Sequence, residues 1–212
     1  EKIIFLAKMS HEIRTPMNAV LGLTYLSLRE NTNPKVKKSL LQIDKSGKKL
    51  LNIINNILDL AKVEANKIRV KNKDFVLEDT INDVINLVNV QLKEKKNIEF
   101  SCQYDQNIPR KINSDSTRIK QILMNLLDNA IKFTPKGDII MKCQLKAMDT
   151  DTITLSFEIS DSGIGISSTK LKNIFEPFKQ EDNSTTREYG GAGLGLGISK
   201  SLIEKMGGKL GS

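Results

Sequence analysis

Residues 36–61, VKKSLLQIDKSGKKLLNIINNILDLA, carry the pattern that decides the first part of the fold. Apolar residues recur there in alternating steps of four and three, which is the heptad spacing of a helix with one packing seam. The seam consists of Val36, Leu40, Ile43, Gly47, Leu50, Ile54, Ile57 and Ala61. Only Gly47 is a weak position in it. The pattern predicts a long amphipathic helix.

Another long helix is predicted before this one in the chain, separated from it by a short turn. Its apolar stripe consists of Leu6, Met9, Ile13, Val20 and Leu23. The turn is Asn31-Thr32-Asn33-Pro34, polar residues followed by a proline suited to a first helical turn. Residues 1–66 therefore predict an antiparallel helical hairpin. One hairpin buries too little apolar surface to be stable alone, so we expect two copies to form a dimeric four-helix bundle.

The rest of the chain predicts a different architecture. The seam stops at residues 67–74, where charge rises, and this segment is the predicted linker. Residues 75–212 predict an α/β two-layer sandwich with antiparallel strands, so the fold class of the whole chain is α+β. Helices are expected at about 77–95, 114–133 and 194–206, and strands at about 97–104, 138–147 and 152–160.

Composition excludes several classes of protein. No run approaches the roughly 18 apolar residues of a membrane span, and no signal peptide is visible. The net charge of +8 comes from dispersed lysines with few aromatic neighbours, which favours solvated helix faces over nucleic-acid binding. Cys102 and Cys143 lack metal-ligand spacing, so we expect buried free thiols in a reducing cytoplasm. Both ends interrupt an element, so we expect further segments on either side.

His11 is the only histidine in the chain. At about 100° per residue it points away from the apolar stripe of its helix, so its ring is expected in solvent. The neighbouring Glu12 could accept an imidazole proton, and Thr15, one helical turn further, could position a water. Pro16 should bend the helix just past this site. A plain surface helix with an unrelated proline is the alternative interpretation.

Residues 9–18, MSHEIRTPMN, resemble the phosphoacceptor motif of sensor histidine kinases, in the form common in hybrid kinases. The resemblance implies that His11 is phosphorylated by ATP and that Glu12 acts as the base. It also implies that Thr15 helps to hydrolyse a phosphorylated partner.

Two glycine-rich stretches in the second half suggest a nucleotide site that is neither a P-loop nor a Rossmann site, because neither motif occurs. Residues 161–166, DSGIGI, leave a predicted strand, and residues 190–197, GGAGLGLG, lead into a predicted helix. Glycines allow close backbone approach to a ligand, and a helix start offers N–H groups to phosphate. An acid at a strand end, here Asp161, can accept hydrogen bonds from an adenine amino group. Ordinary turns and helix caps remain an alternative for each stretch.

The predicted helix at 114–133 carries Asn125 and Asn129 on one face. Their carbonyl oxygens suit Mg²⁺, which prefers hard oxygen ligands and is commonly shared with phosphates. Lys132, followed by Phe133, would then reach phosphate. A purely structural pair of buried asparagines is the alternative.

Residues 125–134, NLLDNAIKFT, together with the glycine stretches, resemble the Bergerat-type ATP-binding domain of histidine kinases, within the group that includes gyrase, Hsp90 and MutL. The resemblance implies that Asn129 holds Mg²⁺ with help from Asn125 and that Asp161 recognises adenine. It also implies a phenylalanine box at 175–178 and a lid between about Ser167 and Gly193. The expected ATP-binding residues are Asn125, Asn129, Lys132, Phe133, Asp161, Gly163, Gly165, Phe175, Phe178, Arg187, Gly191, Gly193, Gly195 and Leu196.

The sequence departs from the family pattern at three lid-region positions. Gln180 stands where many members carry an arginine, and Arg187 is our hypothesis for the replacing charge. Glu188 and Ala192 replace residues that are often lysine and threonine, which puts phosphate affinity in doubt. The final strands of the family also lie beyond the end of this sequence, and their loss would leave a sheet edge unpaired.

The family implies a homodimer that passes the phosphoryl group to a response-regulator receiver domain, in trans or on a segment outside this sequence. It implies a cytoplasmic fragment, attached to an inner membrane only through segments outside it. Three alternative functions are compatible with the sequence: a conformational ATPase of the gyrase and Hsp90 group, a non-catalytic ATP-sensing scaffold, and a coiled-coil adaptor. The stimulus, the partner, and phosphorylation within or across the dimer are not encoded in these patterns.

Overall fold

The computed structural model describes residues 2–30, 33–65, 69–167, 174–175 and 194–211. The chain divides into two compact units, Glu1–Ile68 and Arg69–Ser212. Among the described helices, none is long and apolar enough to cross a membrane.

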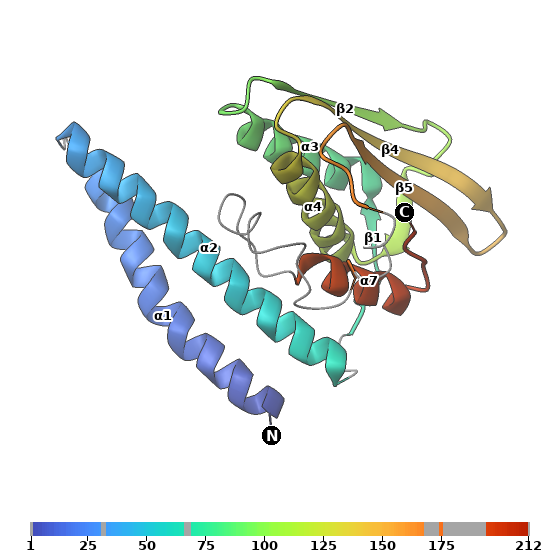
Figure 1. Ribbon diagram of the computed structural model, residues 1–212. Helices are drawn as coiled ribbons and strands as arrows, with labels where there is room; N and C mark the ends of the chain where they lie inside the picture. The colour runs from blue at the N-terminus through green and yellow to red at the C-terminus, as the bar shows by residue number, and fades with distance from the viewer. Residues whose placement is uncertain (1, 31–32, 66–68, 168–173, 176–193, 212) are drawn as a thin grey trace. The chain divides into compact units, whose positions relative to one another are not determined.

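The first unit is a helical hairpin, as predicted. Helices α1 (Lys2–Arg29) and α2 (Pro34–Glu64) run side by side (Figure 1). Asn33 caps α2, because its side-chain oxygen accepts a hydrogen bond from Lys35 N at 2.9 Å, and Pro34 occupies the first turn. Across the hairpin, Arg14 Nη2 donates to Asn55 Oδ1 at 2.9 Å. Helix α1 continues through Pro16 as one helix.

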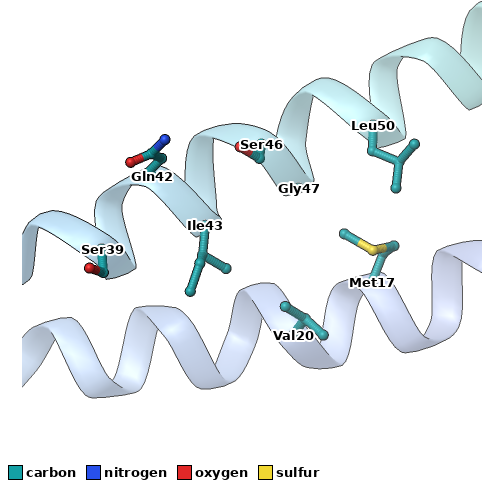
Figure 2. A pocket seen from close by; sticks show the side chains of 8 residues that line it. All are labelled: Met17, Val20, Ser39, Gln42, Ile43, Ser46, Gly47 and Leu50. Atoms are coloured by element: carbon teal, nitrogen blue, oxygen red, sulfur yellow. The ribbon is translucent and has the colours of Figure 1, made fainter. Parts of the chain in front are cut away.

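The predicted seam of α2 is only partly covered within one hairpin. Gly47 is buried, and a Cβ atom built there would lie 2.8 Å from Leu21 Cδ2 of α1, so the glycine allows the two helices to approach closely. Ile43 and Leu50, one turn to either side, remain 44% and 42% exposed. Figure 2 shows these residues around a hollow that also includes Val20. The apolar seam therefore extends beyond what one hairpin buries.

The second unit has two layers. Its elements are β1 (Lys73–Val76), α3 (Leu77–Leu92), β2 (Ile98–Tyr104), β3 (Lys111–Ser114), α4 (Ser116–Phe133), β4 (Gly137–Met148), β5 (Ile153–Asp161) and α7 (Gly195–Lys205). Strands β2, β4 and β5 form one sheet in the order β2-β4-β5, and α3 and α4 cover one of its faces (Figure 1). Strands β1 and β3 form a separate antiparallel pair.

Two sequence predictions for this unit need correction. The prediction of antiparallel strands is confirmed for β4 and β5 but is wrong for β2 and β4, which pair in parallel because helix α4 lies between them in the chain and carries it back across the sheet. Lys73 and Asp74, predicted as linker, lie in strand β1 and pair with Ser114 and Asn113 of β3. Contacts within the second unit begin even before β1, because Lys71 N donates a hydrogen bond to Asp115 Oδ2 at 2.9 Å.

The core lies between α3, α4 and the sheet. Its fully buried side chains include Leu77, Val84, Leu127, Ile139 and Met141. Each such side chain contributes roughly 1.5–3 kcal/mol on burial, so this layer fixes α4 firmly against the strands. Helix α4 is the element that carries the predicted asparagines.

The cysteines are free, as predicted, although Cys102 is only half-buried whereas Cys143 is fully buried. Burial raises the pKa of both thiols, and that of Cys143 to about 12. Because the thiolate is the reactive form, we expect slow reaction of the native protein with a disulfide reagent at neutral pH, with Cys102 ahead of Cys143. Thiol titration by absorbance checks this. Rapid reaction of both thiols before unfolding would contradict it.

Candidate functional site

The predicted phosphoacceptor lies on α1 of the hairpin. His11, Glu12 and Thr15 are all exposed, whereas the adjacent Ser10 is only 3% exposed. Neighbouring residues of a helix point about 100° apart, so the turn that directs Ser10 inward directs His11 outward. Thr15 Oγ1 donates to the backbone oxygen of His11 at 3.1 Å. The imidazole is therefore carried on a rigid helix within reach of solvent.

The second candidate site is built around the end of strand β5. Asp161 Oδ1 accepts hydrogen bonds from Gly163 N at 2.9 Å and from Thr134 Oγ1 at 3.4 Å. Thr134 is fully buried and follows α4 directly, so it links the end of this helix to the end of the strand. These two donors fix the orientation of the exposed carboxylate and leave its other oxygen to accept from a ligand.

The turn after Asp161 requires glycine at position 163. A Cβ atom there would lie 2.5 Å from the backbone oxygen of Phe133 and 2.6 Å from Asp161 Oδ1. The same Phe133 oxygen accepts from Ile164 N at 3.2 Å, which holds the turn against the end of α4. Gly165 has φ +70, a left-handed conformation that favours glycine. The two predicted glycines of this turn thus serve close packing and backbone shape.

Helix α4 presents the predicted amide side chains next to α7. Asn125 and Asn129 are half-buried. Asn125 Nδ2 lies 3.4 Å from the backbone oxygen of Gly195 and 3.2 Å from Ser199 Oγ, both on α7. Lys132 Nζ lies 4.4 Å from the ring centre of Phe133, a cation–π distance. Helix α4 therefore holds the Asn125 amide against the start of α7, with Asn129 and Lys132 about one and two turns further along α4.

The start of α7 can receive an anion. Its N-cap residue, Leu194, makes no side-chain capping bond, so the first backbone N–H groups are not capped by it. Gly195 and Leu196 are half-buried in this first turn. Further along, Lys200 Nζ lies 5.9 Å from the ring centre of the half-buried Phe175, which links α7 to the predicted phenylalanine box.

The amide groups fit a hard divalent cation. No group of three or more His, Cys, Asp or Glu residues that could hold a metal occurs among the residues with described positions. Amide oxygens are nevertheless suitable ligands for Mg²⁺. Because the nitrogen of Asn125 is directed at α7, its Oδ1 is the atom left for an ion.

The predicted residues fall into three groups. His11, Glu12 and Thr15 lie on α1, and the second unit holds the predicted nucleotide-binding residues of α4, β5 and α7 together with Gly163, Gly165 and Phe175. Phe178, Arg187, Gly191 and Gly193 lie outside the described residues, as do Gln180, Glu188 and Ala192.

Sequence reasoning missed two hydroxyl residues as members of the second site, Thr134 and Ser199. Thr134 directly follows Phe133 at the helix end, and Ser199 is one turn beyond Gly195. Both are completely buried, although threonine and serine are mostly exposed residues. A small polar residue on the apolar face of a helix was the available indication for Ser199.

Both halves of the chain match known families. Residues 1–66 match the family described as the His Kinase A (phospho-acceptor) domain. Residues 114–211 match the family described as histidine kinase-, DNA gyrase B-, and HSP90-like ATPase. The order of the two matches is the order of the two compact units.

Similar proteins cover nearly the whole chain. The autoinducer 2 sensor kinase/phosphatase LuxQ of Vibrio vulnificus (strain CMCP6) is 42% identical over 207 residues, which are 97% of this chain and 24% of LuxQ. The sensor histidine kinase GacS of Pseudomonas protegens is also 42% identical over 207 residues, 98% of this chain and 22% of GacS. A crystal structure of full-length ShkA in complex with AMPPNP has a TM-score of 0.74 at 32% identity, covering 95% of this chain and 41% of ShkA. The chain thus spans about a quarter of the length of these curated relatives.

Proposed function

This chain belongs to the sensor histidine kinases, and we propose that it transfers the γ-phosphoryl group of ATP to its own His11. The observation that supports the proposal is the exposed His11, next to Glu12 on helix α1, in a chain whose second unit matches an ATPase family. Residues 1–66 would serve dimerisation and phosphotransfer, and residues 75–212 would bind ATP.

Adenine would be recognised at the end of β5. One carboxylate oxygen of Asp161 accepts hydrogen bonds from Gly163 N and Thr134 Oγ1, and the other oxygen would accept one from the adenine amino group. The phosphates would lie toward the first turn of α7, where the Leu194 side chain caps none of the first N–H groups and Gly195 allows close approach. Lys132 would add positive charge at the phosphates, together with Arg187.

Mg²⁺ would neutralise charge on the phosphates when bound. Asn129 and Asn125 would hold it through their amide oxygens, and the Asn125 contact to α7 leaves its oxygen available for this purpose. The remaining work of the protein is positioning, since phosphoryl transfer needs alignment and charge stabilisation more than covalent help.

The transfer itself would use the exposed face of α1. One imidazole nitrogen of His11 attacks the γ-phosphorus, a nitrogen–phosphorus bond forms, and the bond to the bridging oxygen breaks to release ADP. The Glu12 carboxylate accepts the proton from the other imidazole nitrogen. The phosphoryl group then passes to an aspartate of a response-regulator receiver domain, in trans or on a segment outside this sequence.

The chain would act as a homodimer through its hairpin. Val20, Leu23 and Ile43 are 42%, 66% and 44% exposed, and the hollow lined by Met17 and Leu50 is open (Figure 2). A second hairpin would cover this apolar surface and complete a four-helix bundle. We place the fragment in the cytoplasm, with any membrane anchor in segments outside this sequence.

Thr15 would serve the reverse reaction, dephosphorylation of the receiver. Thr15→Ala should lower the phosphatase rate about 10-fold or more while sparing autophosphorylation, because the hydroxyl positions water and not the γ-phosphate. Release of phosphate from a phosphorylated receiver measures the first rate, and labelling of the chain measures the second.

Thr24→Ala is the matched control for this experiment. Thr24 lies on the same helix, and its hydroxyl also bonds back one turn, to the Val20 oxygen at 2.7 Å. Thr24→Ala should not lower the phosphatase rate relative to the autophosphorylation rate. Equal loss of both activities in Thr15→Ala would refute this division of labour.

The proposal as a whole is tested by incubating the chain with Mg²⁺ and γ-labelled ATP. Acid-labile label on the protein is the expected result. Release of inorganic phosphate without labelled protein would contradict it and favour a conformational ATPase.

A further inference from the structure

The second unit contains a polar contact between two helices in which one partner, Ser199, has no role in the proposed function. Ser199 lies on α7 and is fully buried, yet its Oγ accepts a hydrogen bond from Asn125 Nδ2 of α4 at 3.2 Å. The same amide nitrogen lies 3.4 Å from the backbone oxygen of Gly195, one turn earlier on α7. One amide group therefore bridges two successive turns of α7.

The chemistry of these partners fixes the orientation of the Asn125 amide. A backbone carbonyl oxygen can only accept hydrogen bonds, so the atom of Asn125 that faces Gly195 O must be the nitrogen. A rotated amide would place two oxygens against each other and would direct the nitrogen, which has no free lone pair, at a ligand. With the nitrogen held at α7, the Asn125 oxygen stays available.

The contact also fixes the start of α7. A Cβ atom on Gly195 would lie 3.7 Å from Asn125 Cγ and 3.9 Å from Asn125 Cβ, so the first turn packs directly on this side chain. That turn is the end of α7 whose first backbone N–H groups the Leu194 side chain does not cap. The amide orientation and the position of the phosphate-facing turn are therefore set by one contact.

We propose that Ser199 is a positioning residue of the nucleotide site, which holds the Asn125 amide with its oxygen toward Mg²⁺·ATP and docks the first turn of α7 on α4. The inference deepens the proposed function and rests on it. Ser199 acts only through Asn125 and touches no substrate. Its loss should therefore weaken binding that depends on Mg²⁺ more than binding of nucleotide alone.

The first experiment compares Ser199→Ala with Ser201→Ala in the whole chain. Ser201 lies on the same helix, but its hydroxyl bonds back to the Gly197 oxygen at 3.1 Å and not to α4. Affinity for a fluorescent ATP analogue is measured over a range of Mg²⁺ concentrations and again in EDTA. Ser199→Ala should lower the affinity with Mg²⁺ by roughly 2- to 10-fold, the effect of one hydrogen bond, with a smaller change in EDTA. Ser201→Ala should match the wild type in both.

The second experiment is a double-mutant cycle of Ser199→Ala and Asn125→Ala without nucleotide. If the two side chains interact, the loss of melting temperature in the double variant should be smaller than the sum of the single losses, by about 3 °C. This readout requires no bound ligand, so it reports on the contact itself.

The outcomes separate the inference from the proposed function. If the wild type binds no nucleotide in the presence of Mg²⁺, both the inference about Ser199 and the proposed function are overturned. Normal wild-type binding with equal behaviour of Ser199→Ala and Ser201→Ala overturns only the inference. Additive losses in the cycle also overturn it, and equal weakening with Mg²⁺ and in EDTA would reduce Ser199 to a structural residue.

Discussion

Asp161→Asn should reduce the affinity for ATP by about 100-fold or more. Gly163 N can only donate, so the asparagine would keep its oxygen on Gly163 and turn its nitrogen toward the ligand. A donor would then face the adenine amino group, which is also a donor. The site would lose a charge-assisted hydrogen bond and gain an unpaired polar contact. Calorimetric titration of the nucleotide measures the change.

Asp149→Asn is the control for this substitution, since Asp149 lies in the turn after β4 and outside the nucleotide site. It should leave the affinity unchanged. The wild type should also prefer ATP to GTP, because the oxygen at the corresponding position of guanine would face the Asp161 carboxylate. A change below about threefold in Asp161→Asn would remove Asp161 from adenine recognition.

His11→Gln should abolish phosphorylation of the chain while leaving nucleotide affinity intact. Glutamine offers no nucleophilic nitrogen, because its amide lone pair is delocalised. His11 is exposed on α1, so its replacement removes no core contact and the melting temperature should not fall. Label from γ-labelled ATP should drop to background, and ATP binding should match the wild type.

Asn18→Gln provides the matched control for His11→Gln. Asn18 is also exposed on α1, and it lies two turns from His11 on nearly the same face. The control variant should keep most of the label. Persistent label in His11→Gln would place the phosphate on another residue and would overturn the assignment of the phosphoacceptor.

Local patterns predicted the helices well. The seam of α2 and the turn that ends at Pro34 were visible because apolar spacing and turn chemistry are local features of the sequence. The helix predicted at 114–133 was equally clear, and α4 spans Ser116–Phe133. The exposure of His11 followed from the same helical geometry.

Long-range pairings were not predictable from such patterns. Strands β1 and β3 each have only 4 residues, and they pair across the whole of α3 and β2. The parallel pairing of β2 with β4 depends on how the chain crosses the sheet, which local alternation does not encode. Ser199 and Thr134 became visible as site residues only through contacts between elements, because hydroxyl residues are common and carry no distinctive spacing.

The transfer of the γ-phosphate to His11 is the central step of the proposed function. The direct measurement incubates the wild-type chain with Mg²⁺ and either γ- or α-labelled ATP, then follows acid lability and maps the labelled peptide. We expect acid-labile, alkali-stable label from γ-labelled ATP alone, in the peptide that contains His11. Acid-stable label, label elsewhere, or no label despite measurable ATP binding would contradict it.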